Sequence, residues 1–171
     1  MQSNTNDKDH SVKSQTEIVA DAIQLVRPSI DLLFKRSNRQ LLHIVVMNPR
    51  LKPWEADFEE AILYETSIGD PATWTIPFDQ LARNKARQAW RNGRANINNQ
   101  LLHPASLRDD DVLFFGTFVY GDIIVASSGV EQWYDMMISG WIAVAIEQLT
   151  MHEYQTIKSE NPGQQTLDAS Q

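Results

Sequence analysis

The stretch VLFFGTFVYGDIIVA, residues 112–126, gives the clearest indication of the fold. Two apolar runs flank the sequence YGD at 120–122, which is typical of a tight turn, and together they predict a β-hairpin with strands at 112–119 and 123–126. Both faces of this hairpin are apolar. A sheet that is apolar on both faces must be covered on both, so the hairpin predicts helices packed on either side.

Two further strands are predicted upstream of the hairpin. The runs LLHIVVM at 41–47 and EAILYET at 60–66 are short and rich in β-branched or large apolar residues. The segment between them, residues 49–59, carries prolines, Trp54 and several carboxylates, and it is long for a hairpin connection. We therefore expect an elaborated loop there.

Three helices are expected around these strands. Apolar residues recur at helical spacing through 18–34, but Pro28 lacks the N–H that a helix interior needs and predicts a kink or two short helices. A second helix is predicted over 77–92, where glycine follows, and a long third one over 131–154. Gly140 within the third helix suggests close approach of another backbone.

The order helix, strand, strand, helix, hairpin, helix predicts a single α+β domain rather than a repeat of βαβ units. The chain has 171 residues, which suits one domain, and we place that domain at 15–158. Residues 1–14 and 159–171 are rich in polar residues that bury too little to offset the entropy of ordering, so both are predicted to be disordered tails.

Composition excludes several classes of function. The formal net charge of −7 provides no basic face for nucleic acid. Cysteine is absent, which excludes thiol nucleophiles, disulfides and cysteine-ligated metal sites. The first residues form no apolar targeting segment, and no apolar run approaches the length of a membrane span. We therefore expect a soluble, cytoplasmic protein without nucleic-acid or membrane partners.

Three short motifs resemble the haem-binding HbpS/GlcG-like family, which is related to the C-terminal domain of PduO-type proteins. They are LARNKARQA at 81–89, YGDIIVASSG at 120–129 and the helix start at 131–135, whose first turn contains an acidic residue. The resemblance covers residues 15–155. It implies a three-layer α/β/α-like domain, with an antiparallel sheet of about five strands and helices on both faces, that assembles into homo-oligomers and binds haem or another small organic ligand.

Positive charge on the middle helix offers one candidate binding surface. Arg83 and Arg87 share a face at i, i+4, while Lys85 points elsewhere. These cations could hold a carboxylated ligand such as haem. The alternative is that they form salt bridges to carboxylates across a subunit interface.

The turn at Ser127, Ser128 and Gly129 is a second candidate, because backbone N–H groups at the start of the following helix could hold an anion. Serine is also a common N-cap, so a structural role stays open. Trp133 could stack on a flat macrocycle or pack in the core or an oligomer contact. His103, just before a proline, is the histidine best placed to reach a haem iron.

No catalytic constellation can be assigned from the sequence. None of the four histidines forms an H-x-x-x-H pair, and His43 is predicted to be a satisfied core or interface residue. The run Asp109-Asp110-Asp111 could hold a hard cation, but it lacks the spacing of a calcium loop and is predicted to be a solvated loop before an apolar strand. The serine at 127 lacks the G-x-S-x-G pattern of esterases.

A different class of function remains open. The Trp54 loop and the acidic surface could dock a protein partner, in which case the chain is an interaction protein without a small ligand.

Overall fold

The computed structural model describes residues 13–163, and the greater part of both predicted tails lies outside the described residues. The elements in chain order are α1 (Gln15–Ser37), β1 (Leu42–Met47), β2 (Ile62–Ile68), the 3₁₀ turn η1 (Pro71–Thr73), α2 (Phe78–Asn92), α3 (Asn96–Leu102), the 3₁₀ turn η2 (Pro104–Ser106), β3 (Thr117–Tyr120), β4 (Ile123–Ser128) and α4 (Gln132–Glu160). None of the described helices is long and apolar enough to cross a membrane.

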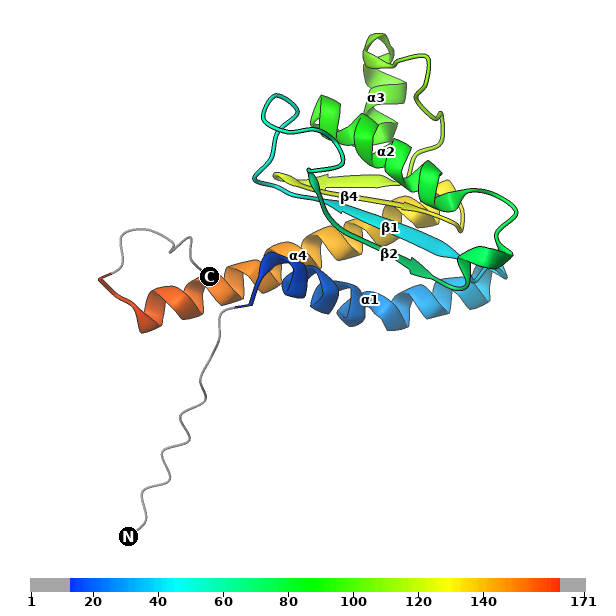
Figure 1. Cartoon of the computed structure of the whole chain (residues 1–171). Coiled ribbons are helices and arrows are strands. Elements are labelled where there is room, and N and C mark those ends of the chain that lie inside the picture. Colours follow the sequence, from blue (N-terminus) through cyan, green and yellow to red (C-terminus); the bar gives the residue numbers. More distant parts are fainter. Residues whose placement is uncertain (1–12, 164–171) are drawn as a thin grey trace.

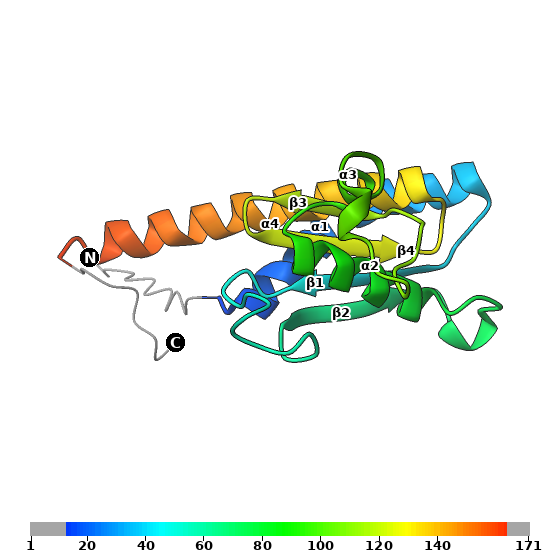
Figure 2. The same cartoon turned by 90° about the horizontal axis from the view of Figure 1, so that it is seen from above.

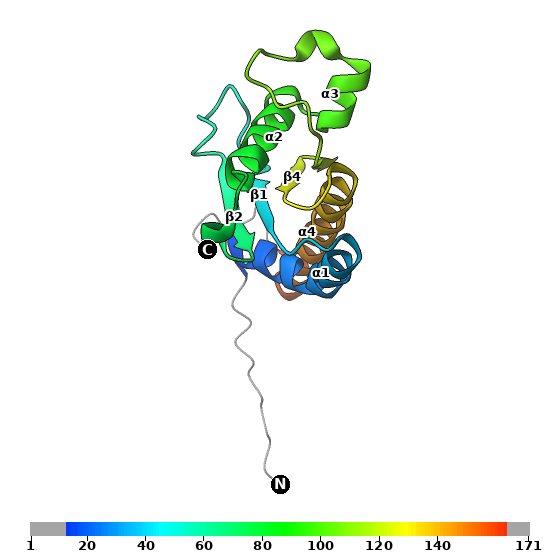
Figure 3. The ribbon, with the colours of Figure 1, turned by 90° about the vertical axis from the view of Figure 1, so that its right-hand side faces the viewer.

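The strands form one antiparallel sheet in the order β2-β1-β4-β3. Helices α1 and α4 lie side by side under one face, and α2 lies across the other with α3 above it (Figures 1 and 3). The predicted α+β architecture with helices on both faces is confirmed. Within residues 13–163 the sheet has four strands, not the expected five or so, and these are the four that the residue patterns themselves predict.

Each face of the sheet has its own apolar core. Alternate residues of β1 supply the two cores, with Ile44 and Val46 facing α1 and α4 and Val45 and Met47 facing α2. All six residues of β1 are therefore buried. This double burial explains why the strand reads as a continuous apolar run rather than an alternating one.

The hairpin forms, but its first strand is shorter than predicted. It begins only at Thr117, and Leu113 and Phe114 are 71% and 60% exposed. The Val112 N–H donates to the side chain of Asn84 (3.0 Å) rather than to a strand. Gly121 opens the two-residue turn with φ of 58°, a conformation that favours glycine.

Helix α1 is continuous through Pro28, so of the two predicted alternatives, a kink or two short helices, the second is wrong. Buried residues lie on both sides of the proline, including Ile23 and Ile30, and their packing outweighs the missing hydrogen bond. The expected helix at 77–92 is confirmed as α2, which ends on Gly93 in the left-handed conformation.

Helix α4 continues to Glu160, past the expected domain end at Lys158, and extends beyond the sheet (Figures 1 and 2). Within it Gly140 leaves room for the ring of Phe118 rather than for another backbone, since a Cβ there would lie 3.1 Å from that ring.

Candidate functional site

A row of polar side chains crosses three strands on the face of the sheet that α2 covers. His43 on β1 lies directly opposite Ser67 on β2 and opposite Ser128 on β4. Glu65 precedes Ser67 by two residues and therefore points to the same face. The strand register alone thus brings together groups that are far apart in the sequence.

His43 is the centre of a hydrogen-bonded chain. Its Nδ1 lies 2.8 Å from Ser67 Oγ, and its Nε2 lies 2.8 Å from Glu65 Oε1. The second oxygen of Glu65 accepts from Arg83 Nη1 at 2.5 Å. The His43 side chain is only 7% exposed, so its polar contacts are made almost entirely within the protein.

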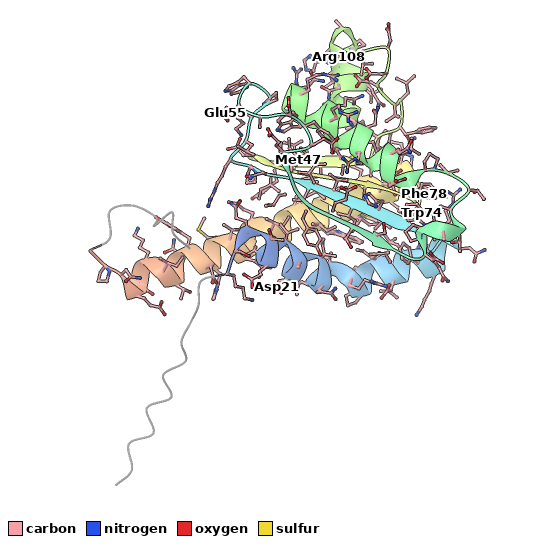
Figure 4. The ribbon with its side chains drawn as sticks, viewed as in Figure 1. Asp21, Met47, Glu55, Trp74, Phe78 and Arg108 are labelled. Atoms are coloured by element: carbon pink, nitrogen blue, oxygen red, sulfur yellow. The ribbon has the colours of Figure 1, made fainter. Side chains whose placement is uncertain are left out.

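A pocket of about 500 Å³ opens beside this chain of groups. Its wall consists of His43, Glu65 and Ser67 together with residues of the segment 71–79. In that segment Trp74 meets the His43 ring edge-on at 6.1 Å between ring centroids and the Phe78 ring at 5.6 Å. Figure 4 places Trp74 and Phe78 next to each other at this end of the sheet.

Trp74 carries an unmet hydrogen-bonding group. Its indole Nε1–H is buried and has no acceptor among the residues that the structure describes. Leaving a buried donor unpaired costs about 1–3 kcal/mol, which a ligand carrying an acceptor would offset. The pocket thus combines a hydroxyl, an imidazole, carboxylates and an unpaired donor with apolar walls.

A second polar cluster is closed rather than open. The Lys85 ammonium is 2% exposed and donates to Ser127 O (3.0 Å), Ser128 Oγ (3.2 Å) and Asp135 Oδ2 (3.2 Å). Asp135 also accepts from the Val130 N–H at 3.0 Å. Burial lowers the pKa of Lys85 and raises that of Asp135, and the charge of each partner opposes the shift of the other.

This closed cluster lies at the turn for which anion binding and a structural role were the two alternatives. Asp135, in the first turn of α4, supplies the negative charge at the start of that helix, and Ser127 Oγ donates to its carbonyl oxygen (2.7 Å). Glu131, the N-cap residue just before α4, makes no side-chain capping bond. Gly129 passes so close to Leu41 O that a Cβ would clash there.

The predicted cationic residues point in two directions, as expected. Arg83 pairs with Glu59 and Glu65. Arg87 lies over the Phe58 ring (4.4 Å to the centroid) and 3.7 Å from a Glu59 oxygen. These salt bridges form within one chain.

The remaining predicted residues lie apart from the pocket. Trp133 is 61% exposed and meets the Phe115 ring at 4.6 Å between centroids. His103 caps the end of α3 and is exposed. Asp111 is held by Arg91 and by the Arg108 N–H. The described residues contain no group of three or more histidine or acidic side chains that could hold a metal ion.

The pocket beside His43 offers no free histidine ligand for a haem iron among the described residues. Both ring nitrogens of His43 are already engaged, and the cations that could hold propionates are paired with carboxylates. The eight expected site residues do not line the pocket beside His43, although Arg83 contacts its wall through Glu65.

Comparison of the chain with known protein families, with curated proteins and with solved structures finds no match. The site is therefore interpreted from its own geometry.

A second pocket of about 470 Å³ lies at the other end of the sheet, between α1, α4 and the turn of the hairpin. Its walls are mostly apolar, with Leu63, Ile123 and Ile146 among them, and they contain neither histidine nor serine. The pocket beside His43 is the better candidate, because it has convergent polar groups that could orient a ligand.

Sequence reasoning missed His43, Glu65, Ser67 and Trp74 as a group. A histidine between apolar residues in β1 and a glutamate and a serine two apart in β2 were the available signals. The sequence does not show that His43 lies beside Glu65 and Ser67, because that depends on the register between the two strands.

Proposed function

We propose that this chain binds a small organic ligand in the pocket beside His43. The observation that carries the proposal is a 500 Å³ pocket whose wall contains the His43 chain of hydrogen bonds and Trp74, whose buried Nε1–H has no acceptor among the described residues. A ligand with a carbonyl or similar acceptor and a flat apolar part matches these walls. This ligand class differs from haem.

The test uses Trp74→Phe, which keeps an aromatic ring but removes the indole N–H. A library of small aromatic carbonyl compounds is screened by saturation-transfer NMR, and haemin is titrated in parallel by its Soret band. We expect binders to lose at least tenfold in affinity in Trp74→Phe and to keep their affinity in the control Trp133→Phe, whose ring lies on the surface. A saturable Soret shift that survives both substitutions would instead favour haem at another place.

We further propose that the chain forms homo-oligomers. The support is a stripe of exposed apolar side chains on α4, namely Trp133, Met137, Val144 and Met151, which follow one another by four or seven residues. Such spacing keeps side chains near one face of a helix. Light scattering after size exclusion measures the mass, and Val144→Glu should reduce it to that of one chain.

The exposed Trp54 favours the alternative of a protein-docking function. It is 81% exposed on the loop between β1 and β2. If the chain is an interaction protein, Trp54→Ala abolishes capture of its partner and leaves ligand binding at the His43 pocket unchanged.

A further inference from the structure

We propose that Ser67 is the nucleophile of an acyl-transfer reaction in the pocket, with His43 as its general base and Glu65 as the residue that positions His43. The inference rests on the proposed function, because it assigns a reaction to the same pocket. It concerns esters of small organic acids, and water is the only co-reactant.

The three groups have the connectivity that an activated serine requires. Ser67 Oγ is 2.8 Å from His43 Nδ1, and His43 Nε2 is 2.8 Å from Glu65 Oε1. In hydrolytic enzymes with unrelated folds, the nucleophile likewise contacts a base that a carboxylate orients. In those enzymes the histidine Nε2 faces the serine and Nδ1 faces the carboxylate, whereas here Nδ1 faces Ser67 and Nε2 faces Glu65. This exchange changes the side from which the imidazole meets the serine, but the proton still passes from the hydroxyl to the imidazole.

Glu65 and Arg83 define the direction of the hydrogen bonds. Arg83 donates to one oxygen of Glu65, so the other oxygen is available as an acceptor for His43 Nε2–H. A neutral imidazole that donates through Nε2 has its lone pair on Nδ1. That lone pair then faces the hydroxyl of Ser67, which can donate its proton to it.

The sheet holds these groups in place without the help of a mobile loop. His43 and Ser67 are direct partners in the β1–β2 ladder, and Glu65 lies on the same face of β2. Side chains on paired strands are positioned more accurately than side chains on loops. The geometry is therefore present before any substrate binds.

The pocket supplies room and a hydrogen-bond donor for the substrate. Pro71, Ile76 and Pro77 give it apolar walls suited to an acyl or alkoxy group. Trp74 lines the pocket and its Nε1–H has no acceptor among the described residues, so we assign it as the donor that a turn of the Trp74 side chain would bring to the carbonyl oxygen. A donor placed at such an oxygen stabilises the negative charge that develops on it during the reaction.

The reaction balances with water alone. Ser67 Oγ forms a bond to the carbonyl carbon while its proton passes to His43 Nδ1. Collapse of the tetrahedral intermediate breaks the bond to the alcohol, which leaves with that proton. Water then attacks the acyl-serine and gives a proton to His43, and a second collapse releases the carboxylic acid and restores the Ser67 hydroxyl.

The experiment treats the full chain with an alkyl fluorophosphonate and locates the adduct by peptide mass spectrometry, with p-nitrophenyl acetate hydrolysis as the second readout. We expect one adduct on Ser67, its loss in Ser67→Ala, and at least a hundredfold slower labelling in His43→Gln. Thr66→Ala is the matched control, because its side chain lies next along β2 and points to the opposite face.

Glu65→Gln tests positioning separately from structure. We expect it to slow labelling at least tenfold and Glu65→Asp, which keeps a carboxylate, to restore part of the rate. A merely structural role of Glu65 would not depend on the carboxylate in this way. Circular dichroism of each variant verifies that it is folded.

Absence of an adduct on Ser67 in the folded wild-type chain, or labelling that His43→Gln does not slow, overturns the proposal. Binding of acetophenone, a ketone that cannot be hydrolysed, is measured on the same samples by saturation-transfer NMR. Binding without labelling removes the nucleophile but leaves the binding function standing. If the folded chain shows neither labelling nor acetophenone binding, both the acyl-transfer proposal and the binding proposal are wrong.

Discussion

Replacing Lys85 by methionine should destabilise the protein strongly, and replacing Asp135 at the same time should recover part of the loss. Lys85→Met keeps the length and apolar stem of the side chain but removes the ammonium. It leaves the carboxylate of Asp135 buried, with the Val130 N–H as a remaining donor. Asp135→Asn removes the negative charge and keeps an acceptor for that N–H.

The expected magnitudes follow from the burial of the pair. The two side chains are 2% and 5% exposed, and the backbone at Gly116 closes the space, since a Cβ there would lie 2.7 Å from Lys85 Nζ. Removing one partner of such a pair costs about 3–5 kcal/mol, because the other charge stays buried without compensation. The double variant removes both charges, so it should be at least about 2 kcal/mol more stable than the sum of the single losses implies.

Urea unfolding at pH 7 measures these losses. With an m-value of about 2 kcal/mol/M, a loss of 3 kcal/mol lowers the midpoint by about 1.5 M. Circular dichroism and tryptophan fluorescence should give the same midpoint. If the loss in free energy of unfolding of the double variant equals the sum of the two single losses to within about 0.5 kcal/mol, the coupling of Lys85 and Asp135 is refuted.

Three further substitutions test other parts of the structure by the same urea assay. Gly129→Ala should cost about 1–3 kcal/mol, because φ is 152° and the new Cβ meets Leu41 O; an unchanged midpoint would contradict this tight approach. Burial alone would raise the pKa of Asp111, but hydrogen bonds from Arg91 and from a backbone N–H outweigh it and lower that pKa. Because the Asp111 pKa is lower in the folded than in the unfolded protein, the ionised carboxylate stabilises the fold at pH values above its unfolded-state pKa, and this stabilisation is lost as the pH falls through its folded-state pKa. Asp111→Asn should therefore lower the free energy of unfolding by about 1.5–3 kcal/mol at pH 7 and leave it unchanged in strong acid. Trp54→Ala should change stability by less than about 0.5 kcal/mol, and a larger loss would mean that this exposed ring is packed.

The fold was largely predictable because its elements have strong local signals. The turn glycine at 121 and the glycine stop at 93 mark the hairpin and the end of α2, and both residues adopt positive φ. Helix α3 lacks such signals, since it is short, polar and anchored by the buried Asn96 and Asn99. The early part of the predicted strand at 112–119 is apolar but exposed, and local composition does not distinguish a strand from an apolar loop.

Of the candidate site, only the side chains that α2 contributes could be predicted from the sequence. The i, i+4 spacing correctly separates Arg83 and Arg87 from Lys85, and the turn at Ser128 does meet Lys85. His43 and its partners could not be assembled, because a shift of one residue in strand pairing would turn every side chain of a strand to the other face. The register is a tertiary property, and the pocket depends on it.

The closed cluster and the pocket share one support, which is helix α2. Arg83 connects the helix to Glu65 on β2, and two residues later Lys85 connects it to Ser128 on β4. His43 lies between these strands and is the direct partner of Ser128. A buried ion pair that contributes little net stability can still fix the position of a helix on a sheet, because an unpaired charge in any other arrangement would be costly. We therefore expect the Lys85–Asp135 pair to help fix the position of α2, and with it the contact between Arg83 and Glu65 beside His43.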